Sequence, residues 1–208
     1  MAILWVAMSF SVCKTEKGRL LINIVHVVGK DLLKLDSATY KNELGQSYTV
    51  SNFKYYISNI ILKTGEGKEY MSDDYFLINE DDAGSKKLTL KNIPSGKYTS
   101  LRFTLGVDSL HNCSGAQSGA LDPANGMFWA WNSGYIFLKL EGKSPASLSP
   151  GHIFEYHIGG YRHPDNCIRE INLELTEPLD VSDGKIKQLV VCADVSQILK
   201  TPETIDFS

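Results

Sequence analysis

The stretch Ser100 to Val107 (SLRFTLGV) decides the fold, because apolar residues occupy every second position along it. Those residues are Leu101, Phe103, Leu105 and Val107. Successive side chains of a β-strand point to opposite faces, so this period of two predicts a strand with one apolar face. Such a face must be buried against another layer, which indicates a sheet within a sandwich.

Other strand-like segments flank this stretch on both sides. They are Arg19 to Val28, Tyr48 to Leu62, Tyr75 to Ile78, Leu88 to Leu90, Ile153 to Ile158, Ile168 to Leu175 and Ile186 to Val195. Turn sequences such as Thr64 to Lys68 (TGEGK) separate them, and a last helical turn is expected at Ser196 to Lys200. The sequence contains no alternating βα pattern and therefore predicts an all-β fold, an antiparallel β-sandwich with Greek-key connections.

The bulk composition restricts the function. A chain of 208 residues with 43% hydrophobic residues can bury one core, so we expect a single sandwich domain over residues 18–200. A net charge of -3 and the lack of any basic run argue against nucleic acid as a partner. The G-x-S-x-G, P-loop and G-x-G-x-x-G motifs are all missing from the sequence, so we expect a protein that is not an enzyme.

The first residues resemble a secretory leader. Met1 to Val12 is a run of apolar and small residues that is too short to span a bilayer but matches the core of a signal peptide. The alternative is a buried first strand. We expect residues 1–13 to be a leader and the protein to be periplasmic or exposed at the cell surface. Cys13 follows the run, and its lipidation would be the protein's only attachment to a membrane.

Three further cysteines would meet an oxidising compartment, where disulfides persist. Cys113 and Cys167 lie in polar loop sequences, whereas Cys192 lies in an apolar strand. The first two are therefore the favoured disulfide pair, and Cys192 is expected to be a buried free thiol. The sequence leaves the connectivity open.

The segment Met127 to Gly142 (MFWAWNSGYIFLKLEG) follows a loop of about twenty residues that has no hydrophobic period, and loops of that length are usually functional. Interpreted as a strand, it projects Met127, Trp129 and Trp131 on one face. One interpretation makes these side chains ordinary core. The other makes them a functional face, because the opposite face already supplies core residues.

His157 is the strongest metal-ligand candidate among the histidines. It has the opposite parity to the apolar residues of Ile153 to Ile158, so it should face away from the core, and neutral imidazole is the commonest metal ligand. His111 in the long loop and His163 are further candidates, whereas His26 in the first strand is expected to be structural. The alternative for His157 is an exposed strand histidine without a ligand.

Calcium is a second metal to consider. Two acidic loops, at 73–74 and 80–82, lack the spacing of an EF-hand. The better oxygen donors are Asp108, Asp122 and Asn125 in the long loop. Solvated turns are the alternative interpretation of all these residues.

Three motifs, FTLGVDS, GALDPANGMFWAWNSGYIFLKLEG and YHIGGY, resemble the MbnP family of exported copper-associated proteins, in particular its Bacteroidetes-type branch. The upstream segment NELGQSYTVSNFKYYISNIIL is also similar, so the resemblance extends from about Gly18 to Asp194. It implies copper as the bound metal. It also implies a partner, a di-haem enzyme of the cytochrome peroxidase type, that oxidises a tryptophan to kynurenine.

The resemblance assigns the tryptophan-bearing strand to Met127 through Trp131 and one copper-binding histidine to His157. His111 lies near the family's other histidine position but in a different local sequence. A Met thioether, an imidazole and an aromatic amine would suit Cu(I). The competing hypothesis is a structural or adhesion sandwich without a metal.

Overall fold

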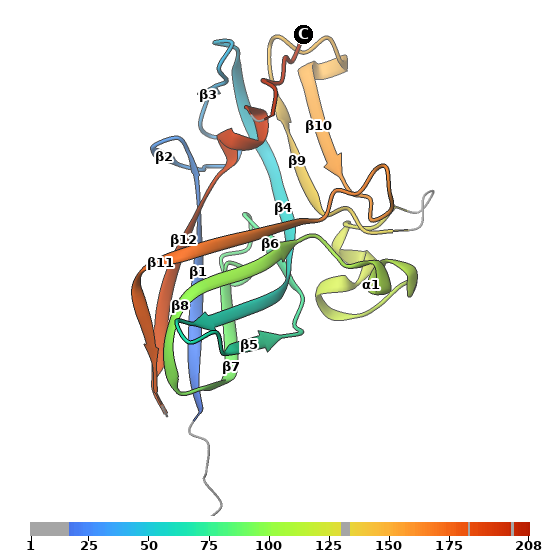
Figure 1. The fold of residues 1–208 in the computed structure, drawn as a ribbon. Coiled ribbons are helices and arrows are strands. Elements are labelled where there is room, and N and C mark those ends of the chain that lie inside the picture. The colour runs from blue at the N-terminus through green and yellow to red at the C-terminus, as the bar shows by residue number, and fades with distance from the viewer. Residues whose placement is uncertain (1–16, 130–133, 183, 201) are drawn as a thin grey trace, which may run out of the picture.

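The computed structural model describes residues 17–129, 134–182, 184–200 and 202–208, and it forms two β-sheets packed on one core (Figure 1). The predicted all-β sandwich is confirmed. The expected leader at 1–13, the lipidation site Cys13 and the candidate Trp131 lie outside the described residues. Within the described ranges, no helix combines the length and the apolar character that a membrane crossing requires.

The smaller sheet is built around one strand that alternates between buried and half-exposed side chains. Its strands are β1 (Lys17–Val28), β2 (Asp31–Leu32), β7 (Lys87–Pro94) and β12 (Ile186–Asp194). β1 pairs with β7 and β2 in antiparallel fashion, but it pairs with β12 in parallel. The prediction of a wholly antiparallel sandwich is therefore wrong for this one pair. The alternation of apolar residues within each strand does not reveal the relative direction of two strands.

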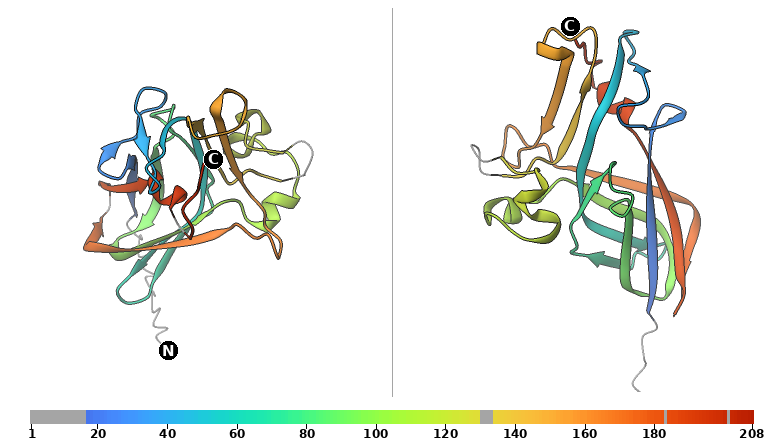
Figure 2. Two further views of the ribbon diagram at one scale, coloured as in Figure 1. Left: turned by 90° about the horizontal axis from the view of Figure 1, so that it is seen from above. Right: turned by 180° about the vertical axis from the view of Figure 1, so that it is seen from behind.

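The larger sheet has the order β10-β9-β4-β8-β11, with three short strands added along β4 (Figure 2). Its strands are β3 (Tyr40–Lys41), β4 (Ser47–Thr64), β5 (Glu69–Ser72), β6 (Phe76–Asn79), β8 (Gly96–Leu105), β9 (Leu138–Lys143), β10 (Ile153–Ile158) and β11 (Arg169–Val181). The helical turns are α1 (Ser109–Cys113), η1 (Gly119–Leu121), η2 (Pro123–Asn125), η3 (Pro150–His152) and η4 (Val195–Leu199). The predicted last turn is thus η4.

β4 buries side chains on both of its faces. Its pairing with β8 shifts register between Ser58 and Ile61, and Asn59 has a φ of 50°, as expected for a bulge. The adjacent Tyr55 and Tyr56 are both buried, the first in the main core and the second in a smaller cluster. This second core comprises Tyr56, Val107, Leu121, Met127, Tyr135, Ile136 and Phe137.

The second core explains why Met127 to Gly142 is not one strand. Residues 127–129 run antiparallel to 134–136, with a bridge between Phe128 and Tyr135, and the regular strand begins only at Leu138. The Trp129 amide donates to the Gly134 carbonyl at 3.0 Å. The sequence Asn-Ser-Gly at 132–134 is a turn signal, and the apolar residues around it hid that signal in the prediction.

The expected cysteine pairing is also wrong, because Cys113, Cys167 and Cys192 are all free thiols. The Cys113 thiol donates to the Tyr161 hydroxyl at 3.3 Å. Cys192 is exposed rather than buried, since β12 forms the edge of the smaller sheet and both of its faces stay partly accessible.

The packed domain extends beyond Lys200. Phe207 is 6% exposed, and its ring lies 4.7 Å from that of Phe154 and 5.6 Å from that of Tyr48. The C-terminal residues therefore cover the end of the sandwich beside β10 (Figure 1).

Candidate metal centre

The candidate centre lies on the outer face of β4, β9 and β10. The inner face of these strands carries core residues such as Phe53, Leu140 and Phe154, so the alternating positions point away from the core. The pairing of β9 with β10 places Glu155 directly opposite Glu141. Like charges at directly opposed positions destabilise a sheet, and a bound cation would remove that repulsion.

Glu141 is the most connected member of this face. Its Oε1 accepts a hydrogen bond from His157 Nε2 at 2.6 Å, and its Oε2 accepts one from Asn52 Nδ2 at 2.9 Å. Lys139 Nζ lies 3.7 Å from Oε1. Partial burial raises the pKa of Glu141, but the hydrogen bonds from Asn52 and His157 and the charge of Lys139 outweigh it, so the net pKa is lowered. Glu141 is therefore a carboxylate at neutral pH.

Glu141, Glu155 and His157 bring their ligand atoms within 4.8 Å of one another. They are the only such trio of His, Cys, Asp and Glu side chains in the described part of the chain. Because Nε2 is the ring nitrogen that faces Glu141 Oε1, an ion shared by the trio would replace the proton between these two atoms, and the remaining ring proton would sit on Nδ1. The trio thus offers one nitrogen and several oxygen donors, a set that suits borderline divalent ions such as Cu²⁺.

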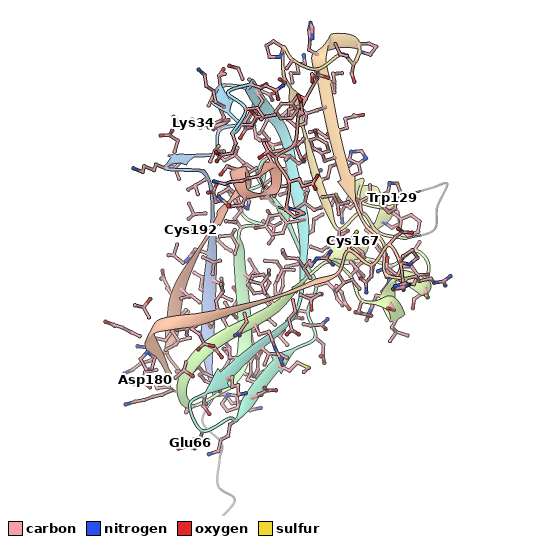
Figure 3. The ribbon with its side chains drawn as sticks, turned by 45° about the horizontal axis from the view of Figure 1, so that its top comes forward. Lys34, Glu66, Trp129, Cys167, Asp180 and Cys192 are labelled. Atoms are coloured by element: carbon pink, nitrogen blue, oxygen red, sulfur yellow. The ribbon has the colours of Figure 1, made fainter. Side chains whose placement is uncertain are left out.

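Trp129 lies near the end of β10 (Figure 3). Its ring packs on Gly159, two residues after His157: a Cβ added at Gly159 would lie 2.6 Å from Trp129 Cη2 and 2.6 Å from the Tyr135 carbonyl oxygen. Only glycine leaves room for the indole. The side chain of Trp129 is half-buried, so it lies between the core interpretation and the functional-face interpretation of this segment.

Met127 is placed apart from the trio. Its side chain is 0% exposed and packs in the second core, because residues 127–129 pair with 134–136 instead of continuing into β9. The structure thus favours the core interpretation for Met127 over a solvent-facing thioether. Its role as a metal ligand stays a prediction, as does that of Trp131.

His111 lies on α1 in a separate cluster. Its Nδ1 lies 3.0 Å from Asp108 Oδ2 and 2.7 Å from the Tyr75 hydroxyl, and that hydroxyl also donates to Asp108 through a very short contact. The carboxylate orients the ring, as carboxylates that are hydrogen-bonded to metal-bound histidines do. The trio described above does not include His111, and His163 is an exposed loop residue.

The oxygen donors proposed for calcium have other partners. Asp108 caps α1 by accepting from the His111 amide, and Asp122 caps η2 by accepting from the Ala124 amide. Asn125 Nδ2 donates to the Gly119 and Ala120 carbonyls. These contacts hold the long loop in shape and give no support to a calcium site.

The sequence reasoning missed Glu141, Glu155 and Gly159. Glu155 has the same parity as His157 in β10, and Glu141 alternates with Leu138 and Leu140 in β9. The outward orientation of both carboxylates could therefore be predicted from the sequence. What the sequence does not contain is the register that sets Glu141 opposite Glu155.

The fold and this site define a β-sandwich protein with a cluster of nitrogen and oxygen donors on a sheet face. The chain belongs to the MbnP family, whose model matches residues 17–208. The resemblance seen in the sequence is thereby confirmed, and it associates the chain with copper; the branch within the family stays a prediction.

The solved structure of MbnP from Methylosinus trichosporium is similar to this chain, with a TM-score of 0.53 and 15% sequence identity. The alignment covers 85% of this chain and 76% of that one, and at this identity it shows a shared fold alone. The search of curated proteins gave no significant match.

Proposed function

We propose that this protein is an exported, non-catalytic copper-binding protein that holds the metal through His157, Glu141 and Glu155. Family membership supports copper as the metal. The observation that carries the proposal is the convergence of one imidazole and two carboxylates within 4.8 Å on neighbouring strands. Bound copper would offset the repulsion between the opposed carboxylates, so its binding energy is coupled to the pairing of β9 and β10.

The donor chemistry favours Cu²⁺ over Cu⁺. Imidazole and carboxylate ligands suit the tetragonal geometry of Cu²⁺, whereas Cu⁺ prefers thioether and thiolate sulfur. The Met127 thioether, the soft donor expected from the sequence, is buried in the second core. The proposed ion is therefore oxidised copper at the surface of the sheet.

Trp129 or Trp131 is the proposed site of oxidation to kynurenine by a di-haem partner enzyme. Trp129 is supported by its position, since its ring covers Gly159 next to the strand that carries His157. Kynurenine would place an aromatic amine at this end of β10. The proposed location is the periplasm or the cell surface, where such a partner and free copper ions would both be accessible.

Copper binding to purified variants tests the ligand assignment. Wild-type protein should retain one copper per chain after desalting, and His157→Ala should bind about tenfold more weakly or worse. His152→Ala is the matched control, because His152 is an exposed histidine on η3 outside the trio. Equal copper content in wild type and His157→Ala would contradict the assignment.

The tryptophan modification needs protein from the native host. Intact-mass analysis followed by peptide mapping should locate a fixed mass shift on the peptide that contains Trp129 and Trp131. An unmodified chain from the host would remove the kynurenine part of the proposal and leave the His157 assignment to stand on the metal analysis.

A structural or adhesion role without a metal is the second candidate function. The complete burial of Met127 favours it for that part of the segment, since core packing alone explains the residue. The same metal analysis separates the two candidates, because an adhesion sandwich would show no copper that depends on His157.

A further inference from the structure

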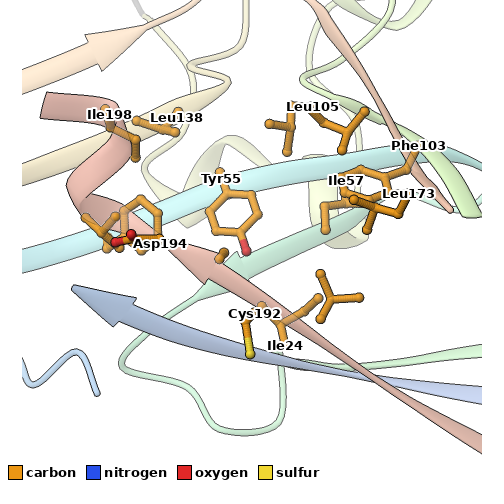
Figure 4. A pocket seen from close by; sticks show the side chains of 15 residues that line it. Ile24, Tyr55, Ile57, Phe103, Leu105, Leu138, Leu173, Cys192, Asp194 and Ile198 are labelled. Carbon is orange, nitrogen blue, oxygen red and sulfur yellow. The ribbon is translucent and has the colours of Figure 1, made fainter. Parts of the chain in front are cut away.

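A cavity of about 250 Å³ lies between the two sheets, and its lining includes none of the proposed copper ligands (Figure 4). Aliphatic and aromatic side chains from both sheets supply most of its lining. The lining residues are Ile24, Phe53, Tyr55, Ile57, Phe103, Leu105, Leu138, Ile171, Leu173, Val191, Cys192, Ala193, Asp194, Val195 and Ile198. A site of this composition favours an apolar occupant.

The cavity has its mouth where the edge strands of the two sheets face each other. β11 and β12 are those edges, and their inward-facing Leu173 and Val191 are only half-buried. Deeper between the sheets, the lining residues Ile24 on β1 and Ile57 on β4 are buried. The sandwich is thus closed at its centre and open between β11 and β12, which gives a small molecule a route into the cavity.

Two polar side chains, Tyr55 and Asp194, belong to this mainly apolar lining, and Asp194 Oδ1 already accepts from the Gly29 and Ser196 amides. Tyr55 is 5% exposed, and Figure 4 shows its ring among the lining residues with the hydroxyl directed toward Ile24 and Cys192. The hydroxyl lies 2.9 Å from Nε2 of the buried His26. His26 Nδ1 in turn lies 2.6 Å from Glu80 Oε2, which also accepts from Lys86 at 2.8 Å.

The direction of the hydrogen bonds that link Tyr55, His26 and Glu80 follows from the Glu80 carboxylate. A carboxylate of Glu80 only accepts, so His26 Nδ1 donates to it. Burial lowers the pKa of His26, which keeps the imidazole neutral and makes Nε2 an acceptor for the Tyr55 hydroxyl. The lone pairs of the Tyr55 oxygen are then available to accept a hydrogen bond. The hydrogen bonds through His26 to Glu80 fix the position of this oxygen.

We propose that this cavity binds a small, mainly apolar molecule that carries one hydrogen-bond donor, of the alkylphenol or medium-chain alcohol class. The donor would bond to the Tyr55 oxygen while the ring or chain fills the space between the sheets. An apolar cavity of about 150 Å³ accepts benzene, so the larger volume here fits a ring with a short alkyl chain. The inference is independent of the copper proposal.

Calorimetric titration with 4-propylphenol tests the site, and β12 supplies a matched pair of variants. Val191 lines the cavity, whereas its neighbour Val190 is 60% exposed and is not among the lining residues. Val191→Trp should weaken binding at least tenfold by filling the mouth, and Val190→Trp should leave it unchanged. Thermal unfolding checks each fold, and Val191→Phe replaces Val191→Trp if the latter does not fold.

Tyr55→Phe tests the polar contact separately. It should weaken 4-propylphenol about threefold to tenfold, as expected for the loss of one hydrogen bond, and should leave the donor-free propylbenzene unaffected. An unchanged affinity for 4-propylphenol in this variant overturns the assigned contact. The absence of wild-type binding, or equal binding by the Val191 and Val190 variants, overturns the site itself.

Discussion

Replacing Gly159 by alanine tests whether the packing of Trp129 on β10 has the geometry described. The added methyl carbon would lie 2.6 Å from Trp129 Cη2, 2.7 Å from Cζ3 and 2.6 Å from the Tyr135 carbonyl oxygen. Carbon atoms pack at about 3.5–4.0 Å, so the ring would have to move by roughly 1 Å. The carbonyl cannot move easily, because Tyr135 is buried and its amide donates to Asn112 Oδ1 at 3.0 Å.

Overpacking of this kind usually costs about 1–3 kcal/mol. For a domain of this size that corresponds to a fall in melting temperature of about 2–12 °C. Thermal unfolding followed by circular dichroism measures the fall, and tryptophan fluorescence should change as the Trp129 ring is displaced.

Gly65→Ala is the control for the glycine replacement itself. Its added Cβ would meet nothing closer than Thr99 Cγ2 at 3.8 Å, and its backbone does not have a positive φ. We expect its stability to stay within about 0.5 kcal/mol of wild type. If Gly159→Ala and Gly65→Ala had the same melting temperature and the same fluorescence as wild type, the close packing of Trp129 on Gly159 would be refuted.

Three further predictions concern the core and the thiols. Burial lowers the pKa of His26 below its ordinary value of 6.5, so the stability that the neutral imidazole contributes is present above that pH and is lost as the pH falls. His26→Gln should therefore reduce the dependence of the unfolding free energy on pH below about 6.5, measured by chemical denaturation. Phe207→Ala should cost about 3–5 kcal/mol in thermal unfolding, whereas Leu148→Ala, at a position that is 88% exposed, should cost less than about 0.5 kcal/mol. Cys113→Ser and Cys192→Ser should each remove one fast-reacting thiol in a titration with a disulfide reagent, and a slow or absent reaction at either position would contradict its exposure.

Alternation along the chain predicted the strands well, because one buried face leaves a clear period of two. β10 spans Ile153–Ile158 as expected, and His157 points away from the core as its parity required. β4 shows the limit of this reasoning: its bulge at Asn59 lets both of its faces be buried, and a second core forms over one of them. No local pattern reveals such a core, so the sequence left the burial of Met127 as one of two interpretations.

The candidate site shows the same division between local and tertiary information. The parity of His157 and Glu155 was available in one short segment, but the partner carboxylate Glu141 comes from another strand. Strand register is set by the packing of the whole sheet and by turn geometry, and the sequence of one strand does not show which residues of another strand it will face. The parallel pairing of β1 with β12 was unpredictable for the same reason.

Electron paramagnetic resonance of the Cu²⁺-loaded protein tests the central proposal most directly. With His157, Glu141 and Glu155 as ligands, the spectrum should be that of a tetragonal site with one imidazole nitrogen coupled to the copper. The nitrogen coupling should disappear in His157→Ala and persist in His152→Ala. A spectrum that keeps its nitrogen coupling in His157→Ala would contradict the proposal that this histidine holds the metal.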